Sequence, residues 1–151
     1  MKLDSQWITG FVDGEGTFYV RITEHSEKSA GYQVIPEFRV VQHKKDIQVL
    51  YALKEFFGCG VVRINHGDRY EFRVRSLKHL SQIIVPFFQK YSLRSKKRID
   101  FLKFRKIIKL MENGKHLKPE GILKIIRIAR QMNRCRKPIT EQFEREIRVK
   151  I

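Results

Sequence analysis

Cysteine is scarce in this sequence, and no long apolar run occurs. Cys59 and Cys135 are the only cysteines among 151 residues, and they are far apart. A disulfide scaffold is marked by several closely spaced cysteines, so this pattern favours small core residues in a reducing compartment. No segment approaches the roughly 20 consecutive apolar residues that cross a bilayer. We therefore expect neither a disulfide framework nor a membrane role.

A targeting segment is also missing from the first residues. Residues 1–6 contain a single lysine, and no apolar run follows them. A secretory signal combines a basic start with an apolar stretch, and a transit peptide is rich in arginine. We expect an intracellular protein, located in a chloroplast, a mitochondrion or a bacterial cytoplasm.

Acidic residues are half as numerous as basic ones. The sequence holds 16 aspartates and glutamates against 32 lysines and arginines, which gives a formal net charge of +16. Such an excess repels itself unless a polyanion is the usual partner. An anionic membrane surface would also attract the charge, but the basic residues are scattered over predicted strands and helices. Double-stranded nucleic acid is therefore the expected partner.

Helical and strand periodicities alternate along the chain. Apolar residues recur at three- and four-residue spacing in some segments and at every second residue in others, which predicts amphipathic helices and half-buried strands. The helical segments are residues 3–16, 47–57 and 77–87, and the strand segments are residues 17–25, 33–40, 61–64 and 70–75. The predicted fold class is α+β, in the order αββαββα, with a curved antiparallel sheet as the DNA-binding face and additional C-terminal helices.

A single domain is expected for a chain of this length. Residues 1–133 are predicted to form it, because two further amphipathic segments, residues 95–111 and 120–132, can brace the sheet. Residues 134–151 alternate charges without a clear apolar stripe. We expect a basic, loosely docked C-terminal tail there.

Polar side chains occupy the outward positions of the predicted strands. Arginine can pair with guanine in the major groove of DNA, and glutamine or asparagine can pair with adenine. Half-buried strands also present polar residues to water without any binding role, but this face is more basic than solvation requires. The predicted DNA contacts are Tyr19, Arg21, Thr23, His25, Gln33, Glu37, Arg39, Arg63, Asn65, Arg73 and Arg75.

The most distinctive segment is WITGFVDGEG, residues 7–16, a helix with small residues that ends in two carboxylates. Gly10 and Gly14 lie four residues apart, a spacing that lets two helix backbones approach closely. A two-fold pair of such helices would bring two copies of Glu15 together. Metal-dependent hydrolysis of a phosphodiester needs clustered carboxylates of this kind. The predicted dimer interface consists of Trp7, Gly10, Phe11 and Gly14.

This segment resembles the signature of the LAGLIDADG homing endonucleases. Residues 38–42, 54–60 and 93–101 are also similar to that family in spacing and residue type, so the resemblance covers about residues 5–112. Within the motif, the residues in matching places are Ile8, Gly10, Phe11, Val12, Asp13 and Gly16.

The resemblance implies a set of catalytic residues. Glu15, where most members have aspartate, would bind a divalent cation such as Mg²⁺ together with the Gly14 carbonyl. Gln42 would position the water or the metal shell. Lys97, or Lys96 if the loop shifts by one residue, would stabilise charge at the scissile phosphate.

Two acidic residues need a separate interpretation. In some members of the family a basic residue follows the position of Gln42 by four, where this chain has Asp46. Lys44 or Lys45 could substitute for it. Asp13 is expected to brace the turn between helix and strand rather than to bind metal.

The chain contains one copy of the motif, and single-motif members of the family are homodimers. The resemblance therefore implies an intron-encoded homing endonuclease that hydrolyses both strands of a long, pseudo-palindromic double-stranded DNA target as a homodimer. Two alternatives remain open: a maturase that binds intron RNA, and a basic DNA-binding protein whose active site has decayed. Intact Glu15, Gln42 and Lys97 favour cleavage, whereas Asp46 favours a decayed site.

Overall fold

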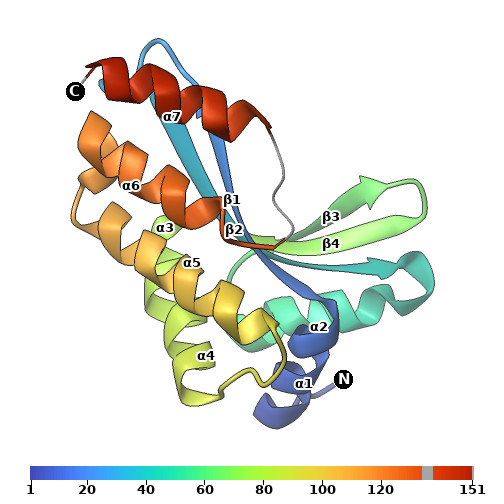
Figure 1. The fold of residues 1–151 in the computed structure, drawn as a ribbon. Coiled ribbons are helices and arrows are strands. Elements are labelled where there is room, and N and C mark those ends of the chain that lie inside the picture. Colours follow the sequence, from blue (N-terminus) through green and yellow to red (C-terminus); the bar gives the residue numbers. More distant parts are fainter. Residues whose placement is uncertain (134–137, 151) are drawn as a thin grey trace. The chain divides into compact units, whose positions relative to one another are not determined.

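The computed structural model of the protein describes residues 1–133 and 138–150 (Figure 1). The order of its elements confirms the predicted αββαββα pattern with helices added at the C-terminal end. The helices and strands are α1 Ser5–Glu15, β1 Gly16–Glu24, β2 Tyr32–His43, η1 Lys44–Asp46, α2 Ile47–Phe57, β3 Val61–His66, β4 Arg69–Val74, α3 Leu77–His79, η2 Leu80–Ile84, α4 Val85–Lys90, α5 Lys97–Glu112, η3 Lys115–Leu117, α6 Pro119–Ala129 and α7 Pro138–Lys150.

The strands form one four-stranded sheet in the order β1-β2-β4-β3, with β4 antiparallel to both β2 and β3. The chain divides into two compact units. Residues 1–18 and 37–98 make up the first unit, and residues 19–36 and 99–151 make up the second. Strands β1 and β2 therefore contribute residues to both units. That residues 1–133 behave as one domain stays a prediction.

An aromatic core lies on one face of the sheet in the first unit. Phe38 of β2 and Phe72 of β4 are buried, with ring centroids 6.2 Å apart. Phe57 of α2 stacks on Phe72 at 6.1 Å, and Phe88 of α4 meets Phe38 edge-on at 5.5 Å. Figure 1 shows α2 beneath β3 and β4. Since side chains alternate along a strand, the residues between these aromatic ones point to the other face of the sheet.

The helical segment after β4 does not stop at its proline. A π-helical turn, η2, joins α3 to α4, and Pro86 lies in the first turn of α4. A proline lacks the N–H that a continuous α-helix would need there, and a wider turn can absorb this loss. Leu80 and Ile84 of the π-helical turn are completely buried. Pro86 therefore changes the helix locally and does not end it.

The expectation of a loosely docked tail is wrong for residues 138–150. They form α7, in which Phe143 and Ile147 are buried within the second unit. The Tyr32 hydroxyl donates a hydrogen bond to Glu146 of α7 at 2.9 Å. Residues 134–137 of the predicted tail, which include Cys135, and residue 151 lie outside the described residues.

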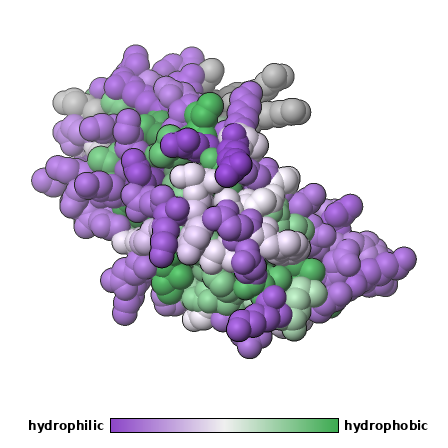
Figure 2. All heavy atoms as spheres, turned by 90° about the horizontal axis from the view of Figure 1, so that it is seen from below, coloured by the Kyte–Doolittle hydropathy of each residue, from purple (hydrophilic) through white to green (hydrophobic). Residues whose placement is uncertain are grey.

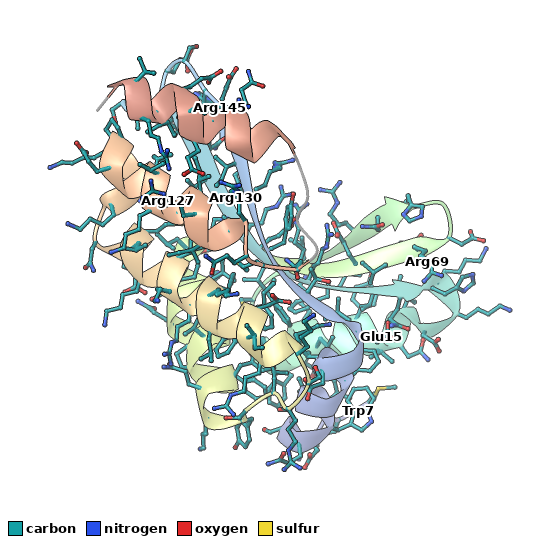
Figure 3. All side chains as sticks on the ribbon, viewed as in Figure 1. Trp7, Glu15, Arg69, Arg127, Arg130 and Arg145 are labelled. Atoms are coloured by element: carbon teal, nitrogen blue, oxygen red, sulfur yellow. The ribbon has the colours of Figure 1, made fainter. Side chains whose placement is uncertain are left out.

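A buried carboxylate joins α6 to α7 in the second unit. Glu144 of α7 accepts hydrogen bonds from Arg127 at 3.1 Å, from Arg130, and from Arg148 at 2.8 Å. Burial raises the pKa of Glu144, but the arginine hydrogen bonds and charges outweigh it, and the pKa lies below its ordinary value. Figure 3 shows Arg127 on α6, Arg130 directly after the end of α6, and Arg145 on α7.

Within the described part of the chain, no helix is long and apolar enough to cross a membrane.

Candidate functional site

Three of the predicted catalytic side chains meet where α1 runs into β1. Glu15 is the last residue of α1 and is exposed, and Gln42 of β2 donates a hydrogen bond from Nε2 to Glu15 Oε2 at 3.3 Å. Lys97, the first residue of α5, donates from Nζ to the backbone carbonyl of Gly16. Figure 3 shows Glu15 at the end of α1 nearest the sheet. Lys96 is exposed, and of the two lysines it is Lys97 that contacts the end of α1.

Asp13 holds the loop before α5 against the end of α1. Its carboxylate accepts hydrogen bonds from the backbone N–H of Arg94 at 2.8 Å, from that of Ser95 at 3.0 Å, and from Ser95 Oγ at 2.6 Å. Ser95 Oγ also accepts from the Lys97 backbone N–H at 3.2 Å. Asp13 is thus a brace, as expected, but for residues 94–97 and not for the turn between helix and strand. This brace sets the position from which Lys97 reaches Gly16.

The pKa of Asp13 reflects these contacts. Burial raises the pKa of the carboxyl, while the hydrogen bonds from Ser95 and Arg94 and the charge of Lys97 lower it. The lowering effects prevail, so the pKa of Asp13 lies below its ordinary value. A carboxylate that accepts several hydrogen bonds is stabilised in its charged form. Asp13 therefore stays ionised and bound to the loop at neutral pH.

Glycine is required at position 16 but not, within one chain, at positions 10 and 14. A Cβ on Gly16 would lie 2.6 Å from Val12 Cγ1 and 3.0 Å from the Val12 carbonyl oxygen. A Cβ on Gly10 or Gly14 would meet nothing within 4 Å. The small residue at position 16 therefore allows close packing inside the first unit. Those at positions 10 and 14 leave open space on the outer side of α1.

Apolar residues accompany this open space on α1. Trp7 is 46% exposed and stacks on Phe11, with ring centroids 4.8 Å apart. Figure 3 shows Trp7 on the outer side of α1. Figure 2 views the molecule from the lower side of Figure 1, where α1 lies, and shows apolar and weakly polar residues gathered near the middle of this view among hydrophilic ones. Among the described residues, Trp7, Gly10 and Gly14 are exposed and Phe11 is half-buried, so the four residues predicted for a dimer interface lie on an accessible face of α1.

The donors at the end of α1 suit a hard divalent cation. The Glu15 carboxylate, the Gly14 carbonyl and the Gln42 amide all offer oxygen, the ligand atom that Mg²⁺ and Ca²⁺ prefer. Among the described residues, no group of three or more histidine, cysteine, aspartate or glutamate side chains could hold a metal ion. A single copy of the chain therefore supplies the right kind of ligand at this point but too few carboxylates.

The sheet face opposite the aromatic core carries the predicted contacts of the first unit. Arg39 and Arg73 face each other across β2 and β4, and Arg63 of β3 lies opposite Glu71 of β4. Glu37 was expected to be an outward DNA contact, but it is buried and paired with Arg39 and Arg75. Glu71 was missed by the sequence analysis. Its position two residues before Arg73 on β4 was the signal that could have identified it.

The other predicted contacts belong to the second unit. Arg21 of β1 is exposed, and Tyr19, Thr23 and Gln33 are half-buried on β1 and β2. His25 lies just beyond β1, which ends at Glu24, and its backbone N–H donates to the Gly31 carbonyl at 2.9 Å. His25 is therefore part of the loop between the strands, one residue past the strand in which it was expected. The role of these five residues in DNA binding stays a prediction.

The lysines considered as substitutes at Asp46 differ in their surroundings. Lys44 Nζ lies 3.1 Å from Asp68 Oδ1, and the Lys44 backbone N–H donates to the Asp68 carbonyl at 2.8 Å. Lys45 and Asp46 are both exposed in η1. Lys44 thus ties η1 to the turn between β3 and β4. Lys45 has the more accessible charge of the two candidates.

Comparison with known proteins shows close relatives. A family model described as LAGLIDADG endonuclease matches residues 8–108. Probable intron-encoded endonuclease 2 of Neurospora crassa is 34% identical over 151 residues, which cover 98% of this chain and 33% of that protein. The chain thus spans about a third of the length of this curated relative.

Solved structures share the fold over nearly the whole length of this chain. The crystal structure of the homing endonuclease I-TnaI superposes with a TM-score of 0.93 at 53% identity, over 97% of this chain and 99% of that one. The LAGLIDADG homing endonuclease I-SmaMI bound to cleaved DNA gives a TM-score of 0.93 at 34% identity, over 97% of this chain and 49% of that one. In length, this chain corresponds to all of the I-TnaI chain and to half of the I-SmaMI chain.

Proposed function

The chain belongs to the LAGLIDADG endonuclease family, and we propose that it is an intron-encoded homing endonuclease that hydrolyses both strands of a long, pseudo-palindromic DNA target as a homodimer. The observation that carries this proposal is the exposed Glu15 carboxylate at the end of α1, beside Gln42 and Lys97. A family member that had lost cleavage would have no need to keep these three groups together.

Each group has a role in hydrolysis. Two Mg²⁺-binding carboxylates, one from Glu15 of each subunit, would hold divalent cations, which activate water and neutralise phosphate charge when bound. Gln42 orients the Glu15 carboxylate through its amide hydrogen bond. Lys97 places a positive charge beside the Gly16 carbonyl, where it stabilises the negative charge that develops on the scissile phosphate. Asp13 keeps Lys97 there by bracing the preceding loop.

Dimerisation is proposed from the open face of α1 and from the lengths of the relatives. Gly10 and Gly14 leave space for a second backbone, and the exposed Trp7 would be covered by it. A large apolar side chain that is exposed next to such a space is typical of an interface. Two copies of this chain would match the length of I-SmaMI, of which one copy covers 49%. The dimer would also bring together two Glu15 carboxylates, of which one chain supplies only one.

Binding to double-stranded DNA is proposed from charge and from a relative. The net charge of +16 favours a polyanion, and the sheet presents arginines on the face away from the aromatic core. I-SmaMI, which shares the fold, was solved bound to cleaved DNA. We therefore propose that this chain lays the arginine-bearing face of its sheet along a major groove.

One selection experiment tests the proposal. The protein is incubated with a randomised duplex library and Mg²⁺, and the ends of cut molecules are sequenced. We expect recovery of one long motif with two-fold pseudo-symmetry, cut on both strands, and no cutting when EDTA replaces Mg²⁺. Uncut duplexes, or cutting without sequence preference, would contradict the proposed function.

A further inference from the structure

Two glutamates are nearly buried on the arginine-bearing face of the sheet in the first unit. Glu37 of β2 is 4% exposed, and Glu71 of β4 is 5% exposed. Removing a carboxylate from water is costly unless charged or hydrogen-bonding partners compensate it. Polar residues on a solvated sheet face do not need such burial. The burial of these two carboxylates therefore requires specific partners on the sheet.

Each carboxylate is shared by two arginines. Glu37 Oε2 accepts a hydrogen bond from Arg75 Nε at 3.2 Å, and Glu37 Oε1 lies 3.7 Å from an Arg39 guanidinium nitrogen. Glu71 Oε1 lies 3.7 Å from Arg63 Nε and 3.6 Å from an Arg73 guanidinium nitrogen. In addition, Asn65 Nδ2 donates to Glu71 Oε2 at 3.2 Å. We call this set of residues the glutamate–arginine network.

Without the glutamates, this network would place like charges side by side. Arg39 and Arg73 are direct partners across β2 and β4, and like charges in that position destabilise a sheet. Burial and the charges of Arg75 and Arg63 lower the pKa of Arg73, whereas Glu71 and Glu37 act in the opposite direction. The glutamates thus offset repulsion among the arginines. They also restrict where each guanidinium group can turn.

An arginine has more donors than a carboxylate uses. The guanidinium group carries five N–H donors in a rigid plane, so a contact with one glutamate leaves others directed away from it. A guanidinium in a fixed orientation can meet the two acceptors of guanine, O6 and N7, whereas a mobile one can turn to any nearby phosphate. Arg63 and Arg75 remain substantially exposed, at 53% and 36% of their side-chain surface, so their remaining donors are accessible.

We propose that Glu37 and Glu71 are positioning residues that set sequence discrimination on this face by fixing the orientations of Arg39, Arg63, Arg73 and Arg75. This inference rests on the proposed binding of DNA to the sheet. The glutamates lower the affinity for any duplex, because they hold the arginines away from phosphates and add negative charge. They raise the ratio of specific to non-specific affinity.

Glu71→Gln provides the test, because glutamine keeps the size and the acceptor for Asn65 while it removes the charge. Dissociation constants are measured in Ca²⁺ for the selected target duplex and for a shuffled duplex of equal length and composition, at several salt concentrations. We expect tighter binding to the shuffled duplex, and a specificity ratio that falls about tenfold. The slope of log affinity on log salt should steepen by about 1 for each released arginine.

Glu55→Gln is the matched control, since Glu55 is exposed on α2 and the substitution changes the net charge equally. The control should leave the specificity ratio unchanged. An equal effect of both substitutions would overturn the inference, because general charge would then explain it. The inference would also be overturned if Glu71→Gln weakened binding to both duplexes equally in a protein that melts normally. That result would indicate a structural role for Glu71.

Two further measurements keep the outcome decisive. If Glu71→Gln fails to fold, Glu37→Gln and Glu71→Asp undergo the same comparison, and Glu71→Asp should retain more discrimination than a neutral residue does. Wild-type protein that fails to distinguish the two duplexes would contradict the proposed function itself. Wild-type discrimination with an unchanged ratio in Glu71→Gln and Glu37→Gln would overturn only the role of the glutamates.

Discussion

Glutamates have opposite surroundings in two regions of the first unit. At the end of α1, Glu15 is exposed and accepts a hydrogen bond from Gln42. On the sheet, Glu37 and Glu71 are nearly buried between arginines. An exposed carboxylate keeps lone pairs for a cation, whereas a buried one has its lone pairs occupied by internal partners. The surroundings of Glu15 therefore fit its proposed role in binding a cation, and those of Glu37 and Glu71 fit their proposed role in orienting arginines.

The largest expected effect is the loss of cleavage when Glu15 at the end of α1 loses its charge. Glu15→Gln removes the charge that a divalent cation requires and keeps the size of the side chain, so cleavage should fall by several orders of magnitude. Affinity for the target should survive or rise, because a negative charge near the phosphates is lost. Cleavage rate in Mg²⁺ and dissociation constant in Ca²⁺ are measured on the same duplex. Near-normal cutting would refute the role of Glu15, and loss of binding would indicate a structural one.

The next largest effect is expected for a substitution on the open face of α1, which should prevent dimerisation. Gly10→Leu should leave each subunit folded, because a Cβ there meets nothing within 4 Å and leucine favours a helix over glycine by about 0.5–1 kcal/mol. It should convert the protein to a monomer by light scattering and abolish double-strand cleavage. Gly16→Ala is the contrasting variant. Its Cβ would clash with Val12, so it should destabilise the fold by about 1–3 kcal/mol.

A smaller effect is expected for an arginine of the sheet, and none for a lysine of a helix. Arg73→Ala should reduce the preference for particular bases by ~1–3 kcal/mol at the positions that Arg73 contacts. Lys109→Ala removes an exposed charge from α5 in the second unit and should not change that preference. Affinities for a panel of single-base variants of the target provide the measurement. Equal loss on every variant with Arg73→Ala would mean that this arginine binds phosphate only.

The smallest effect concerns the brace at Asp13. Its pKa is lowered in the folded protein, so its charge stabilises the fold above about pH 4, and this stabilisation is lost as pH falls through the lowered folded value. Asp13→Asn should therefore melt a few degrees below wild type at pH 7, with a difference that shrinks toward pH 3. Asp46→Asn is the matched control, because Asp46 is exposed and its side chain makes no cap hydrogen bond to α2. A difference that grows on acidification would contradict the brace.

Much of the fold could be predicted because local periodicity reports which face of an element is buried. The alternation in β1, β2 and β4 and the three- and four-residue spacing in α1 and α2 were sufficient for the element order. The prediction was wrong for α7, where Phe143 and Ile147 are separated by charged residues. Glu144 can be buried there because arginines from α6 and α7 compensate it, and no local pattern reveals such partners.

The sequence by itself determined the motif at residues 7–16, the acidic residue Glu15 within it and the basic character of the chain, because these depend on residue types and short spacings. Only the tertiary structure decided that Lys97 reaches Gly16, that Asp13 braces a loop about 80 residues further along the chain, and that Glu37 and Glu71 lie buried among arginines. These are contacts between residues distant in the chain. They form when packing brings strands and loops together, and a neighbour in space leaves no periodic mark on the sequence.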